Sequence, residues 1–151
     1  MEHKETLTYG IHTSHLINLV SRAAMTITGN KRLQSISAGW IVYPGLHQNQ
    51  SSLFTYWTAD GNNKTCCYNA LCPGFVHVST KYAIGALAQP VSIYDGQQYH
   101  LKISLYQDHV TGDRWFLLLD EPIGYWPRSL FNPKGLADGA IECGDLGRRS
   151  L

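Results

Sequence analysis

Charged residues are scarce in this sequence of 151 residues: Lys, Arg, Asp and Glu make up 15% of it, and the formal net charge is +1. A typical soluble domain carries about 25% charged residues. The near-neutral balance gives no electrostatic reason to expect nucleic acid or an anionic membrane surface as a partner. No apolar run approaches the ~18 residues that a membrane-spanning helix needs. The first ten residues also lack the apolar centre of a secretory signal.

Glycine and aromatic residues take the place of charge. The chain holds 14 Gly, 9 Tyr, 4 Trp and 4 Phe, and 44% of its residues are hydrophobic. This composition excludes a disordered chain and favours strands joined by tight turns over helices with a charged outer face. The length is that of a single ordinary domain.

The pattern along the chain predicts an all-β protein. Runs of alternating or aromatic-rich residues predict strands at 25–28, 37–43, 53–58, 74–79, 98–106 and 114–119. Turn residues follow several of these runs, for example Asp60-Gly61 and the segment 108–113. Strands at this spacing predict an antiparallel β-sandwich or barrel. Residues 15–24 are ambiguous, because Leu16, Leu19 and Val20 follow a helical spacing.

The four cysteines do not have the spacing of a metal site. Three of them, Cys66, Cys67 and Cys72, lie within seven residues, and Cys143 stands far from them. A zinc site would need cysteine or histidine pairs at two separated places, so we expect no metal and no cofactor. A local disulfide joining Cys72 to either Cys66 or Cys67 fits better, since adjacent cysteines rarely pair with each other.

Two N-x-S/T sequons, at Asn49 and Asn63, lie in polar loop segments. They predict glycosylation sites, and together with a disulfide they favour an oxidising, secretory compartment.

Familiar catalytic motifs are missing. The seven histidines are scattered, and the sequence has no G-x-S-x-G, H-E-x-x-H or glycine-rich phosphate loop. Most aspartates sit in turn patterns, where they cap backbone N–H groups. The carboxylates that stand out are Glu142 and Asp145, in a glycine-rich segment beside Cys143.

A series of aromatic and cysteine motifs, in one order, resembles the neprosin domain of plants. The motifs are FTYWTADG from Phe54, CYNALCPGF from Cys67 and GYWPRSLF from Gly124, and the resemblance runs from about Ser35 to Asp145. It implies an antiparallel β-sandwich, secretion, and a glutamic peptidase that cleaves next to proline at acidic pH. It also implies a disulfide between Cys67 and Cys72.

Both positions that match the family's catalytic glutamates are substituted. The first family segment, I-E-A-G-W, reads Ile36-Ser37-Ala38-Gly39-Trp40 here, and the second, W-G-G-E, corresponds to Glu142-Cys143-Gly144-Asp145. Ser37 has no accessible anionic form to serve as a general base, and Asp145 is one methylene shorter than Glu. We therefore expect peptidase activity to be lost or strongly weakened. An active proline-directed endopeptidase that uses Asp145 is the alternative; Glu142 would need a three-residue slip, which reverses its facing.

The resemblance also implies domain limits and a cellular location. Residues 1–34 are expected to be a divergent N-terminal part of the domain, and residues 35–151 the neprosin domain itself, truncated at its C-terminus. The signal, the activation segment and the last strands of the family are not found in the sequence, so we expect a sandwich that is incomplete at both ends. Extracellular placement is implied by the family alone.

A third hypothesis is a secreted or cell-wall binding module for Pro-containing peptides. Four aromatic rings would suit polyproline II ligands, and they belong to Tyr56, Trp57, Tyr125 and Trp126. The alternative for these rings is packing in the protein core.

Overall fold

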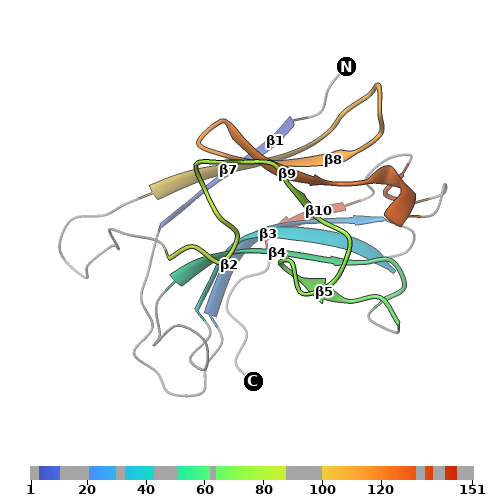
Figure 1. Ribbon diagram of the computed structural model, residues 1–151, viewed down its shortest axis with the longest axis horizontal. Helices are drawn as coiled ribbons and strands as arrows, with labels where there is room; N and C mark the ends of the chain where they lie inside the picture. Colours follow the sequence, from blue (N-terminus) through green and yellow to red (C-terminus); the bar gives the residue numbers. More distant parts are fainter. Residues whose placement is uncertain are drawn as a thin grey trace.

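Two antiparallel five-stranded sheets face each other in the computed structural model (Figure 1). The structure describes residues 4–10, 21–29, 33–42, 51–61, 64–87, 100–131, 135–137 and 142–145. The order in sheet A is β1 (Lys4–Gly10), β7 (His100–Gln107), β8 (Arg114–Leu118), β9 (Glu121–Trp126) and β6 (Val76–His77). The order in sheet B is β10 (Glu142–Asp145), β2 (Ser21–Gly29), β3 (Gln34–Val42), β4 (Ser51–Thr58) and β5 (Cys67–Tyr68). The predicted antiparallel β-sandwich is confirmed.

The main core lies between the two sheets. Side chains alternate between the faces of a strand, and the inward-facing ones form one large buried cluster. Sheet A contributes Ile103, Leu105, Phe116, Ile123 and Trp126, and sheet B contributes Met25, Ile27, Ile36, Ala38 and Trp57. The alternation predicted for 98–106 is confirmed at Ile103 and Leu105, both of which are fully buried.

The middle of the outer face of sheet B is also buried. Ala24, Phe54 and Tyr56 form a second apolar cluster, separate from the main core. Thr26 and Ser37 belong to this outer face, and their exposed fractions are only 6% and 1%. The outer face is therefore not an ordinary solvated sheet surface, although its strands alternate as an antiparallel sheet should.

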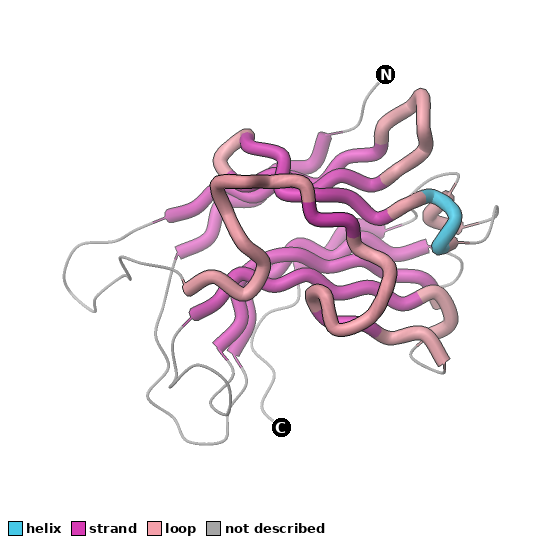
Figure 2. The backbone as a smooth tube through the Cα atoms, in the orientation of Figure 1, coloured by secondary structure: helices cyan, strands magenta, loops and turns pink. Residues whose placement is uncertain are grey.

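One continuous segment joins the edges of the two sheets. After β5 the chain crosses from sheet B to β6 in sheet A and then returns to sheet B, mostly as loop (Figure 2). On its return, Leu53 of β4 bonds to this segment through Ala86 O and Gly85 N, each at 2.8 Å. The free edge of β4 is thus covered, which protects it from pairing with another chain.

The strand predictions hold for most of the sheet residues. Those at 25–28, 37–43, 53–58 and 114–119 correspond to β2, β3, β4 and β8, with ends shifted by a few residues. The run 74–79 contributes only the two-residue strand β6. The possible helix at 15–24 is wrong for residues 21–24, which lie in β2 and pair with β3 along their whole length; residues 15–20 lie outside the described part of the chain. Tertiary pairing here overrides a short local pattern.

Strand β9 was not predicted, and its hairpin shows why. Leu119 and Asp120 join β8 to β9 with φ values of 52° and 64°. A two-residue hairpin with positive φ at both positions usually carries Asn-Gly or Asp-Gly, and neither dipeptide is present at this turn.

Within the described residues the only helical element is one 3-10 turn, Arg128–Leu130. No helix in this part of the chain is long and apolar enough to cross a membrane.

Candidate functional site

The position that the resemblance assigns to the first catalytic glutamate lies in the middle of sheet B. Ser37 of β3 pairs with Thr26 of β2 and with Tyr56 of β4, and Tyr56 in turn pairs with Tyr68 of β5. Residues directly opposite each other in an antiparallel sheet share a face, so these four hydroxyl-bearing residues form one row. We call Thr26, Ser37, Tyr56 and Tyr68 the hydroxyl row.

The hydroxyl of Ser37 forms a hydrogen bond with its neighbour in this row. Its Oγ lies 2.7 Å from Oγ1 of Thr26, and both side chains are buried. Either hydroxyl can donate this hydrogen bond. One hydroxyl donates this hydrogen bond and the other accepts it, and neither can become the anionic base that a carboxylate would supply.

The far end of the row is aromatic. The ring centroids of Tyr56 and Tyr68 lie 4.8 Å apart, and Phe54 packs 6.2 Å from Tyr68. The pKa of Tyr56 is raised above its usual range, mainly by burial and to a smaller extent by a hydrogen bond with the Cys66 thiol. Its phenol therefore stays protonated and can donate a hydrogen bond. Tyr68 is 39% exposed and presents the accessible ring of this end.

The two carboxylate positions near the C-terminus lie in β10, at the other end of the row. Glu142 pairs with Thr28, Gly144 with Thr26, and Asp145 with Met25. Because positions alternate between faces, the positions of Glu142 and Gly144 belong to the face of Thr26 and Ser37. The position of Asp145 belongs to the face of Met25, whose side chain lies in the main core.

This register differs from what we expected. The structure does not bring the positions of Ser37 and Asp145 to one face, whereas the position of Glu142 falls on the face of Ser37 without a slip. A buried hydroxyl lies beside it: Oγ1 of Thr28 has no hydrogen-bond partner among the residues that the structure describes. No feature of the sequence alone indicated this register, because β10 is four residues long and pairs with a strand more than one hundred residues away.

The four aromatic rings predicted to bind peptides do not come together. Tyr56 lies on the outer face of sheet B, while Trp57 and Trp126 belong to the main core. Tyr125 pairs with Trp115, at a ring-centroid distance of 4.8 Å, on the outer face of sheet A. Core packing, the alternative considered for these rings, describes Trp57 and Trp126.

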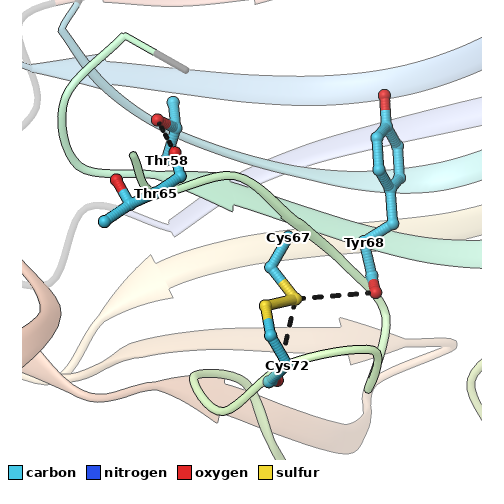
Figure 3. The surroundings of a disulfide bond; sticks show 5 residues. All are labelled: Thr58, Thr65, Cys67, Tyr68 and Cys72. Atoms are coloured by element: carbon cyan, nitrogen blue, oxygen red, sulfur yellow. Dashed lines mark hydrogen bonds between the residues drawn. A yellow bond between two sulfur atoms is a disulfide. The ribbon is translucent and has the colours of Figure 1, made fainter. Parts of the chain in front are cut away.

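The disulfide joins Cys67 to Cys72, as the resemblance implied (Figure 3). Cys67 pairs with Trp57 and is buried in the main core. The ring of Tyr68, the next residue, lies on the opposite side of the strand from the sulfur atoms (Figure 3). Cys66 precedes Cys67, is exposed, and keeps a free thiol. Strand alternation therefore decides between the two pairings that the sequence left open.

Other predicted sites fall partly outside the described residues. Asn49 and Asn63, the two sequon asparagines, both lie outside them. Thr65 of the second sequon is held by Asp60, whose carboxylate accepts a 2.8 Å hydrogen bond from its hydroxyl. Within the part of the chain that the structure describes, no group of three or more His, Cys, Asp or Glu side chains could hold a metal ion.

Taken together, the two facing antiparallel sheets and the hydroxyl row define a β-sandwich protein whose candidate site lies on one sheet face. Residues 18–147 match the Neprosin family. The chain therefore belongs to the neprosin family, and the match includes β2 as well as the motifs that begin near Ser35.

Proposed function

We propose that this neprosin-family protein has lost, or retains only weakly, the proline-directed endopeptidase activity that the family resemblance implies. The observation that carries the proposal is the state of Ser37. The family resemblance assigns it to the position of the first catalytic glutamate. In the structure it is 1% exposed, and its hydroxyl is paired with that of Thr26 at 2.7 Å.

Hydrolysis of a peptide by a glutamic peptidase needs a carboxylate that takes a proton from water. Ser37 cannot do this, and its neighbours in the hydroxyl row do not replace it. Thr26 is another alcohol, and Tyr56 holds its proton because burial raises its pKa. No side chain of the row can therefore activate water near acidic pH.

The alternative, an endopeptidase that uses Asp145, receives less support. The position of Asp145 shares a face with Met25 rather than with Ser37. A carboxylate on that side would be separated from the hydroxyl row by the sheet itself, and catalytic groups have to meet within about 3 Å of the reacting atoms. The position of Glu142 is better placed, but a second carboxylate in the row is still missing.

A binding module for extended, Pro-containing peptides is the second candidate. The partly exposed ring of Tyr68 favours it, because this ring packs at a tilt against Tyr56 on the face that the catalytic residues of the family would occupy. Aromatic rings of this kind receive polyproline II segments. Extracellular placement is part of the same proposal.

The test of activity uses the full chain and fluorogenic proline-containing peptides, assayed from pH 3 to pH 7. We expect no turnover above that of buffer. Measurable cleavage that disappears in Asp145→Ala would establish the alternative, and cleavage that disappears in Glu142→Ala would assign it to the other carboxylate. Either result would overturn the proposal.

Binding is tested separately by fluorescence polarisation with a labelled Pro-rich peptide. Tyr68→Ala should abolish binding if the outer face of sheet B holds the peptide. Tyr125→Ala is the matched control, since it removes a tyrosine from the outer face of the other sheet. Equal binding by all three proteins would exclude this face as the peptide site.

A further inference from the structure

Three buried backbone residues lie between the two sheets at one end of the sandwich. Residues 135–137, which we call the strap, connect no two paired strands directly, yet Leu136 is fully buried in the main core. Both the N–H and the C=O of Leu136 point into protein rather than to solvent, so each needs a partner there.

Sheet A supplies the donors. Arg114, the first residue of β8, donates from Nε and Nη2 to Leu136 O at 3.2 and 3.0 Å. Gln107, the last residue of β7, donates from Nε2 to Ala137 O at 2.9 Å. Gln107 and Arg114 are themselves cross-strand partners, so one pair of residues holds two successive carbonyl groups of the strap.

Sheet B supplies the acceptor and the contact surface. Oε1 of Gln34, the first residue of β3, accepts a 2.9 Å hydrogen bond from Leu136 N, and the Gln34 side chain is fully buried. Its cross-strand partner is Gly29, the last residue of β2. A Cβ atom at Gly29 would lie 2.9 Å from Leu136 N, so the strap rests directly on the backbone of β2.

This arrangement places the strap next to the pairing that positions the carboxylates. Thr28, adjacent to Gly29, pairs with Glu142 of β10. Only four residues of chain, 138–141, separate Ala137 from Glu142, so the five Cα–Cα steps between them span at most about 18 Å. Among the strands that the structure describes, β10 is the outermost of sheet B and pairs only with β2. Its register is therefore open to control by whatever fixes the chain just before it.

We propose that Gln34, Gln107 and Arg114 form a clamp that ties both sheets to the strap and thereby holds β10 in register on β2. The clamp is a positioning device for the strand that carries Glu142 and Asp145. It concerns the fold and holds whether or not the chain cleaves peptides, so its test does not depend on activity.

The test compares amide hydrogen exchange of the full-length wild type with that of Gln34→Leu, which keeps the side-chain volume and removes the acceptor for Leu136 N. Exchange of the amides in 142–145 should accelerate by about tenfold, the effect of losing one buried hydrogen bond. Exchange in β3 and β4 should change much less. Gln107→Leu, a change at a half-buried strand end, is measured in parallel and should show a smaller acceleration at the same amides.

Thr55→Val is the matched control. It removes a buried hydroxyl of sheet B that has no hydrogen-bond partner, and it should leave β10 exchange unchanged. Unchanged exchange of β10 in Gln34→Leu and in Gln107→Leu would overturn the proposal. Acceleration of β3, β4 and β10 by the same factor would overturn it too, because that result means a general loss of stability. If Gln34→Leu does not fold, Gln107→Leu alone decides by the same criterion.

Discussion

The hydroxyl groups of Thr26 and Ser37 meet across β2 and β3 at 2.7 Å, in the row where the family resemblance places a catalytic carboxylate. This hydrogen bond gives each of two buried alcohols a partner without involving an ionisable group. The two hydroxyl groups bond to each other, and neither can act as a carboxylate base. This is the physical reason for expecting little or no catalysis at this face.

The first prediction concerns the energy of this pair. Ser37→Ala should lower the free energy of unfolding by about 1 kcal/mol, because it leaves the Thr26 hydroxyl buried and unpaired. Thr26→Val should do the same for Ser37. The double variant should lose clearly less than the sum, since no unpaired hydroxyl remains. Urea unfolding measures all four proteins, and strict additivity would show that the two groups do not interact.

The second prediction tests the register of β10. In a Cys66→Ser, Cys143→Ser background, cysteines at positions 28 and 142 should form a disulfide on mild oxidation, because cross-strand partners have Cα separations within the disulfide range. Cysteines at positions 28 and 145 should not, since they lie three residues apart along the strand. Non-reducing mass spectrometry distinguishes the two, and cross-linking of the second pair alone would show a different register.

The third prediction concerns the disulfide. Replacing both Cys67 and Cys72 by Ser should lower the free energy of unfolding by about 2 kcal/mol, as expected for closing so short a loop. Cys66→Ser should leave the disulfide intact, because the Cys66 thiol lies by Tyr56 on the other side of the strand. Peptide mapping without reduction checks the pairing. A Cys66–Cys72 peptide in the wild type would contradict the assignment.

The fourth prediction is a dependence of stability on pH at the β7–β8 hairpin. The Asp108 carboxylate accepts hydrogen bonds from the N–H groups of Val110, at 2.8 Å, and Thr111, and these lower its pKa below the ordinary value of 3.8. A lowered pKa in the folded state means a contribution that is complete above about pH 3.8 and is lost as the pH falls through the folded-state pKa.

Asp108→Asn keeps an acceptor oxygen but cannot ionise. The difference in thermal midpoint between wild type and this variant should therefore be constant from pH 7 to about pH 4 and should shrink at lower pH. A difference that grows on acidification would mean that the carboxylate is destabilising in the folded protein.

The fifth prediction concerns the close approach of β6 to β9. A Cβ atom at Gly124 would overlap the carbonyl oxygen of Val76 and the ring of Phe75. Gly124→Ala should therefore lower the free energy of unfolding by about 1–3 kcal/mol and loosen the edge-to-face contact of Phe75 with Trp126. Chemical unfolding and near-UV circular dichroism measure the two effects. Pro122→Ala, an exposed change on the same strand, should have neither effect.

Local sequence patterns were sufficient to predict the strands whose side chains follow an alternating or aromatic-rich pattern. The alternation around Ile103 and Leu105 predicted strand β7, and the aromatic run at 53–58 predicted strand β4. Both succeed because burial of alternate side chains is a local property of the sequence. The hairpin at Leu119-Asp120 escaped prediction because its residues adopt positive φ without the glycine or asparagine that normally marks such a turn.

The candidate site was likewise only partly predictable from the sequence. Sequence motifs located Ser37 and the second carboxylate segment, and the family resemblance identified the disulfide. They could not decide whether Glu142 or Asp145 shares the face of Ser37, because a shift of one residue in a strand moves every side chain to the other face. That choice depends on how a four-residue edge strand pairs with β2.

The sequence by itself determined the all-β character, the region of the disulfide and the family. These follow from composition, alternation and motif order, which are properties of neighbouring residues. Only the tertiary structure decided the pairing of Thr26 with Ser37, the grip of Gln34 and Arg114 on Leu136, and the register of β10. Each of these contacts joins residues from different strands or segments, and each is set by which groups remain to be paired once those strands and segments pack together.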